Sequence, residues 1–206
     1  PPPDTRAPML PTAPAPIASW SWEVSSGTDD LTLTDACTRL HTAADVLAGE
    51  GLCTPRTLRV SWLRPGEGYS GFASVMDIDP AAEFTAAAMA GLVPVGRPAG
   101  LPDAEPQALT LAGPGTWIDA AGEERRTHGL VDATVYLAPW FLEVTVGVRH
   151  DVWLRSDFSG RPHPQVYRRN APRLAAALEG VEKALGLETS PGEPTPHGVP
   201  DKYGIS

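Results

Sequence analysis

Alternating apolar and polar residues predict strands through the middle of the chain. Leu58, Val60 and Trp62 alternate with Arg59 and Ser61, as expected for a half-buried strand over residues 57–64. Similar signals predict strands over residues 72–78, 107–111, 116–118, 130–137 and 142–154. The four residues Ala-Pro-Trp-Phe between the last two strands suit a hairpin connection.

Apolar residues at three- and four-residue spacing predict three helices. The first runs from an N-cap at Thr34 to Gly49, and a short second helix opens at Asp79-Pro80, with Asp79 as its cap. The third covers residues 171–185, with Asn170 as N-cap and Gly186 as its end.

The order of these elements indicates an α+β fold, with a single domain, a mainly antiparallel sheet of hairpins and helices packed on one face. Residues 1–18 are rich in Pro and are expected to form an extended arm. The domain is expected over residues 19–187, and residues 188–206 are expected to form an extended tail.

Charge narrows the classes of partner. The net charge of −9 argues against nucleic acid and anionic membranes as partners, because such polyanions repel an acidic protein. No apolar run reaches the length of a membrane span, and the first twenty residues lack the pattern of a secretory signal. We therefore expect a cytoplasmic protein.

Six of the sixteen cationic side chains fall within Arg149–Arg173, which makes this stretch the strongest candidate for a site. If residues 142–154 form one strand, His150 faces the core and the alternate positions face solvent. The outward set is Arg149, Asp151, Trp153, Arg155 and Asp157. Such charges either pair with one another in solvent or form a recognition surface, since Trp and Arg are enriched where interfaces concentrate binding energy.

Further cationic residues follow in a loop and near the start of the last helix. They are Arg161, His163, Arg168, Arg169 and Arg173, together with Tyr167. A helix N-terminus beside Arg side chains attracts carboxylates or phosphates, and His150 or His163 could then move a proton. Alternatively, these arginines pair with the protein's own acids, for which Asp119, Glu123 and Glu124 are available in another loop.

No motif dictates a reaction, so we predict no catalytic residue, no metal site and no cofactor. Residues 66–71 match G-x-G-x-x-G, but a strand-like segment follows them, which favours a glycine-rich hairpin over a nucleotide site. Cys37 and Cys53 are expected to be free, buried thiols.

The segment from Asp151 to Gly186, with its Gly-Arg-Pro loop and Asn-Ala-Pro-Arg run, resembles uncharacterised proteins of high-GC actinobacteria. The resemblance implies a source and a shared domain, but no activity.

Two functions follow as hypotheses. The first is a non-enzymatic cytoplasmic binding protein, of the immunity or accessory type, that meets a protein partner through the Trp153 and Arg155 face. The alternative is an enzyme or sensor for a small anionic metabolite at the Arg-rich loop. A third hypothesis, a structural subunit, would use the Pro-rich arms as clasps, and the sequence leaves the oligomeric state open.

Overall fold

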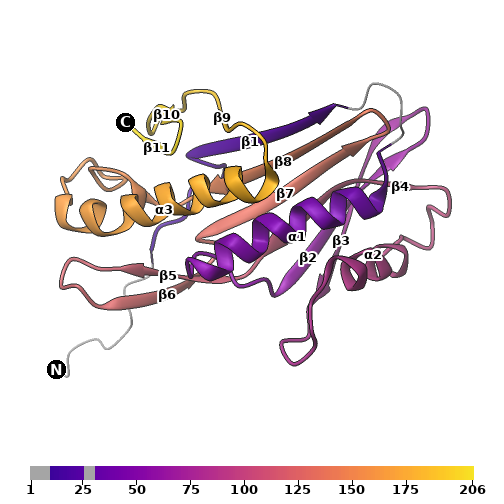
Figure 1. Ribbon diagram of the computed structural model, residues 1–206, viewed down its shortest axis with the longest axis horizontal. Helices are drawn as coiled ribbons and strands as arrows, with labels where there is room; N and C mark the ends of the chain where they lie inside the picture. Colours follow the sequence, from indigo (N-terminus) through magenta and orange to yellow (C-terminus); the bar gives the residue numbers. More distant parts are fainter. Residues whose placement is uncertain (1–9, 26–30) are drawn as a thin grey trace.

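An antiparallel sheet of seven strands, covered on one side by helices, organises the computed structural model, which describes residues 10–25 and 31–206 (Figure 1). In spatial order the strands are β3 (Gly68–Asp77), β2 (Thr57–Arg64), β4 (Glu105–Ala112), β7 (Val131–Ala138), β8 (Phe141–Val148), β1 (Ala18–Ser25) and β9 (Ser190–Pro191). A separate hairpin is formed by β5 (Pro114–Ile118) and β6 (Glu124–His128).

Two long helices, α1 (Leu33–Gly49) and α3 (Pro164–Leu185), lie side by side across the same face of the sheet (Figure 1). The shorter α2 (Ala86–Val95) packs against α1. A single 3₁₀ turn, η1 (Asp151–Trp153), contacts α3. The predicted α+β class, with a mainly antiparallel sheet and helices on one face, is confirmed.

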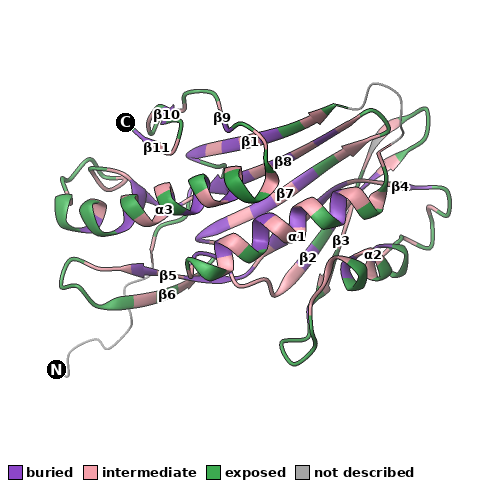
Figure 2. Cartoon of the chain, viewed as in Figure 1, coloured by how far each residue is buried: buried purple, intermediate pink, exposed green. Residues whose placement is uncertain are grey.

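The core lies between the sheet and the two long helices, because the strands alternate in burial with the period of two that the sequence predicts (Figure 2). Trp20 and Trp22 of β1 and Trp62 of β2 are fully buried on the helix-covered side. From the helices, the main contributions are Leu40 and Leu47 of α1 and Leu174 and Leu178 of α3.

The helix starts differ from those predicted. The N-cap of α1 is Thr32, because Thr32 and Asp35 form a reciprocal capping box that Thr34 could not make. Helix α2 begins after Thr85, whose hydroxyl accepts the Ala88 N–H. Asp79 instead accepts the Ala81 N–H in a turn, so its predicted role as helix cap is wrong.

The last helix is longer than the sequence indicates. Helix α3 begins at Pro164, seven residues before the predicted start. Pro172 therefore lies in the interior of the helix. Asn170 is therefore a buried residue within the helix and not its cap. The predicted end is confirmed, since Gly186 adopts the left-handed conformation that terminates helices.

Strands β2, β4, β5 and β7 lie at the predicted places, and the β2–β3 hairpin confirms the interpretation of the glycine-rich motif. Gly66 and Gly68 have positive φ angles at this turn. Strand β6 was not predicted, because its residues Glu124–His128 carry no apolar alternation.

The two ends of the chain pack against the domain in their described parts. Ala13 and Ile17 are buried and donate their backbone N–H groups to the carbonyls of Arg149 and Val148. At the other end, β9 pairs with β1, and the short strands β10 (Pro200–Asp201) and β11 (Gly204–Ile205) form a final hairpin. The predicted arm of residues 1–18 falls in part, at residues 1–9, outside the described residues.

Glu182 of α3 fastens the C-terminal tail. Its carboxylate accepts from the Thr189 N–H at 2.9 Å and from the Thr189 hydroxyl, and it pairs with Lys202 at 3.2 Å. The hydrogen bonds from Thr189 lower the pKa of Glu182 from 4.5 to about 2. The ionised carboxylate therefore stabilises the folded chain.

We expect the contribution of Glu182 to be complete above pH 4.5 and to be lost as the pH falls toward about 2, because the unfolded carboxyl binds a proton first. Glu182→Gln should lower the free energy of unfolding at pH 6 and flatten its decline between pH 4.5 and 2. Urea unfolding at a series of pH values measures both. Parallel curves for the variant and the wild type would contradict this role.

Candidate functional site

The predicted outward face of residues 149–157 does not form. Strand β8 ends at Val148, and the chain then turns through His150 into η1. Only 1% of the Trp153 surface is exposed, so the prediction that Trp153 faces solvent is wrong. The prediction for His150 is confirmed, because it is buried and its Nδ1 lies 2.9 Å from the Pro11 carbonyl.

The charged neighbours of Trp153 are held by internal contacts. Arg149 forms an ion pair with Asp132 at 3.1 Å and donates to the Pro14 carbonyl. Burial raises the pKa of Asp132, and the Arg149 guanidinium opposes that shift. Asp151 is buried, contrary to the predicted outward position, and accepts the Phe158 N–H at 3.0 Å.

The loop that follows is organised by Asp157. Its carboxylate accepts the backbone N–H groups of Ser159 and Arg161, both at 2.9 Å, and the hydrogen bond from the Ser159 hydroxyl contributes most to lowering its pKa. His163 precedes α3 and its Nε2 lies 2.7 Å from the Leu154 carbonyl. Both residues thus shape the loop.

Arginines of α3 fasten the β5–β6 hairpin to the domain. Arg169 donates to the carbonyls of Asp119 and Ala120, and Arg173 donates to Thr116 and to the Glu50 carbonyl. The predicted pairing of these arginines with acidic side chains is therefore replaced by pairing with backbone carbonyls. Asp119 instead forms its ion pair with Arg125 of β6.

Buried Asn170 completes this attachment. Its amide oxygen accepts the Ile118 N–H at 2.8 Å, and its amide nitrogen donates to the Ile118 carbonyl at 2.7 Å. An amide can satisfy both backbone groups of one strand residue, which neither Asp nor Leu could do. The Asn-Ala-Pro-Arg run is thus explained by the packing of α3 on β5.

The ten predicted binding residues do not gather in one pocket. The Arg155 guanidinium lies over the Tyr167 ring at 5.6 Å, while Arg161 and Arg168 are exposed. A nearby pocket of about 330 Å³ includes only Arg155 and Asp157 from the predicted set. This pocket therefore brings together only two of the ten residues predicted to bind a ligand.

Neither cysteine is poised for chemistry. Cys37 and Cys53 are buried and unbonded, as predicted. Burial raises the pKa of the Cys37 thiol to about 11 and that of Cys53 to about 12, so both stay protonated at neutral pH.

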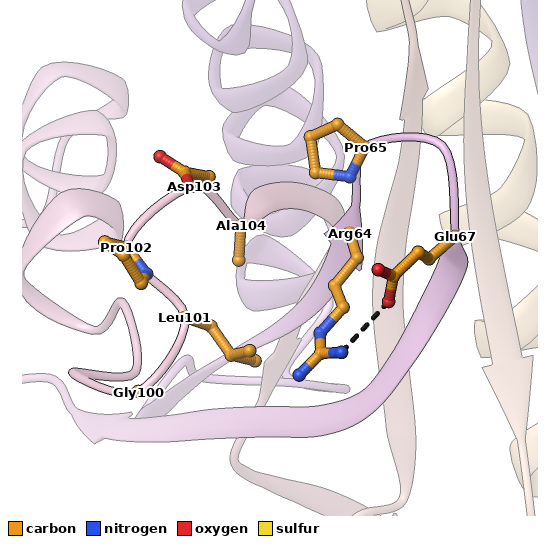
Figure 3. Close-up of a pocket in the computed structure, with 8 residues that line it drawn as sticks. All are labelled: Arg64, Pro65, Glu67, Gly100, Leu101, Pro102, Asp103 and Ala104. Carbon is orange, nitrogen blue, oxygen red and sulfur yellow. Dashed lines mark hydrogen bonds and ion pairs between the residues drawn. The ribbon is translucent and has the colours of Figure 1, made fainter.

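A polar hollow of about 390 Å³ lies between the β2–β3 turn and the segment before β4 (Figure 3). Its one cation, Arg64, is paired with Glu67 at 2.9 Å (Figure 3). Leu101 and Asp103 line the hollow from the segment before β4 (Figure 3). Because Glu67 already neutralises Arg64, this hollow offers no unpaired positive charge to an anionic ligand.

A more apolar groove lies at the end of the sheet where β7 turns into β8, and we call it the end groove. Its volume is about 530 Å³. Its main apolar lining residues are Leu31, Leu33, Leu63, Leu137, Pro139 and Trp140. Glu105 and Gln107 are the polar lining residues. The Leu31 N–H donates to the Pro139 carbonyl at 2.8 Å, which ties the approach to α1 to the β7–β8 turn.

Trp140 distinguishes this groove from the others. It is 68% exposed, whereas the other five tryptophans of the chain are buried. The sequence pattern places Trp140 only in a hairpin connection and does not predict the groove beside it. A tryptophan in so short a turn is itself a signal of exposure, because the turn has no core of its own to bury the indole ring.

Within residues 10–25 and 31–206, no three potential ligands among His, Cys, Asp and Glu come together to hold a metal ion. In the same part of the chain, no helix has the length and apolar character needed to cross a membrane. Comparison with protein-family models, with curated proteins and with solved structures gives no match for this chain.

Proposed function

We propose that this protein is a binding protein that holds an apolar segment of a partner protein in the end groove. The observation that carries the proposal is the exposed Trp140 at the rim of an apolar groove. Tryptophan is the residue most enriched among those that dominate interface energies, and it costs little conformational entropy to immobilise.

The lining of the groove indicates the chemistry of the partner. Leu33, Leu63 and Leu137 provide apolar walls for large aliphatic or aromatic side chains. Glu105 provides a negative charge at the groove, and the whole chain carries a net charge of −9. A partner segment that combines apolar anchors with Lys or Arg therefore suits this site.

Selection from a random peptide library on the immobilised protein tests the proposal. We expect the selected peptides to carry spaced large apolar residues and at least one Lys or Arg. Trp140→Ala should weaken their binding roughly 30-fold, the effect of losing about 2 kcal/mol at a central anchor. The matched control is Val199→Ala, because Val199 is an exposed apolar residue in the C-terminal segment, outside the groove.

Acrylamide quenching gives an independent measurement. Since Trp140 is the only strongly exposed tryptophan, it should account for most of the quenchable fluorescence, and a bound peptide should protect it. Peptides that bind Trp140→Ala as tightly as wild type, or that leave the quenching unchanged, would overturn the proposal. A library that yields only acidic peptides, or only peptides without large apolar residues, would overturn the assignment of the partner.

A further inference from the structure

The face of the sheet opposite α1 and α3 carries no described helix (Figure 1). The N-terminal segment crosses only its margin, where Pro16 lies beside Gly147 and Asp132. The rest of this face, which we call the open face, spans six strands from β3 to β1.

The strand register arranges the open face in rows that run across the strands. One row, the threonine row, consists of Val75, Arg59, Thr110, Thr134, Thr145 and Ser21, in the spatial order from β3 to β1. The next, the glutamate row, consists of Ala73, Ser61, Ala108, Tyr136, Glu143 and Glu23 in the same order.

The open face carries two negative charges on neighbouring strands and a positive charge, Arg59, on a distant strand. Glu23 and Glu143 are direct cross-strand partners, and like charges placed opposite each other destabilise a sheet. Neither has an ion-pair partner among the described residues, and neither does Arg59 at the other side of the face. The face thus holds a cation and an anion pair that cannot reach one another across two intervening strands.

We propose that the open face binds a second copy of this chain, face to face. Consider a two-fold axis between the sheets, parallel to the strands and above the boundary of β4 and β7. This axis places β4 over β7 and β2 over β8 of the other copy, and each row over the same row. Arg59 then lies over Thr145, two residues from Glu143, which is about 7 Å along the strand.

Two of the stacked positions combine a large side chain with a small one. Tyr136, which is 45% exposed, lies over Ala108 of the other copy, which is 7% exposed. Val75, which is 63% exposed, lies over Ser21. These positions are complementary in size, and Arg59 and Glu143 are complementary in charge, as a face that binds a second copy of itself requires.

The two rows set the size of the contact. Six strands spaced by about 4.8 Å and two rows spaced by about 6.8 Å give roughly 400 Å² on each copy. The total of about 800 Å² is below the range of stable interfaces, so we expect a weak dimer that forms at high protein concentration and dissociates on dilution. Two sheets packed in this way form an aligned sandwich.

Sedimentation velocity over a concentration series tests the proposal with charge-reversed variants. Wild type should pass from monomer to dimer as its concentration rises. Arg59→Glu should raise the dimer dissociation constant at least roughly tenfold, because it puts a second negative charge within about 7 Å of Glu143 of the other copy, and Glu143→Arg should do the same beside Arg59. Circular dichroism checks that each variant is folded.

Mixing the two variants provides the decisive step. The mixed dimer has an opposite-charge pair at both symmetric positions, so an equimolar mixture should dimerise more tightly than either variant alone, and the Arg59→Glu/Glu143→Arg double variant should also recover. A wild type that stays monomeric, a dimer indifferent to both reversals, or a mixture without recovery would each overturn the proposal. Because none of these residues lines the end groove, the outcome is separate from that of the peptide experiments.

Discussion

Trp153→Ala is expected to lower the free energy of unfolding by about 3–5 kcal/mol, the range for removing a large buried aromatic side chain. The indole is 1% exposed, and it lies in the 3₁₀ turn that contacts α3. The space left by the substitution cannot be refilled without moving that helix. Urea unfolding followed by circular dichroism measures the loss.

Two controls separate this structural role from a role in recognition. The indole N–H of Trp153 has no described hydrogen-bond partner, so Trp153→Phe should cost much less than Trp153→Ala. Arg155→Ala, at an exposed neighbour whose guanidinium lies over Tyr167, should change stability by no more than about 1 kcal/mol. A Trp153→Ala variant as stable as wild type would restore the interpretation of Trp153 as a surface residue.

Asn170→Ala is expected to lower the free energy of unfolding by about 1–3 kcal/mol. The substitution leaves both the N–H and the carbonyl of Ile118 without this partner, and because these two groups are only partly buried, water replaces part of what they lose. The β5–β6 hairpin should also detach locally, because Asn170 forms one of its main links to α3.

Hydrogen exchange reports this detachment directly. In Asn170→Ala, the amide of Ile118 and the paired amides of β5 and β6 should lose protection more than those of β7 and β8. Arg168→Ala is the matched control on the same helix, since Arg168 is exposed. Uniform loss of protection across the sheet would show that Asn170 supports the whole domain and not the hairpin in particular.

Local patterns predicted the sheet well but could not show where its strands end. The alternation of β8 continues from Val148 to Leu154, yet pairing stops at Val148. Both neighbours stop there as well, since Val148 is paired with Val131 of β7 and with Ala18 of β1. Without a partner strand the chain turns inward, which buries Trp153 and Asp151 together.

The arginine-rich segment shows a related limit. A run of cations in an acidic chain predicts an anion site, but Arg169 and Arg173 meet carbonyl groups of the β5–β6 hairpin instead. That hairpin is distant in the sequence, and β6 has no apolar pattern to announce it. The end groove was equally hidden, because its walls come from segments near residues 31, 63, 105 and 137.

We propose that recognition occurs at the end groove, whereas the Arg149–Arg173 segment mainly holds the fold together. Titration calorimetry of one selected peptide with two variants separates these roles. We expect a roughly 30-fold loss of affinity for Trp140→Ala and an unchanged affinity for Arg161→Ala/Arg168→Ala, which alters only exposed side chains of that segment. Loss of binding in the double arginine variant, with full binding in Trp140→Ala, would contradict this proposal.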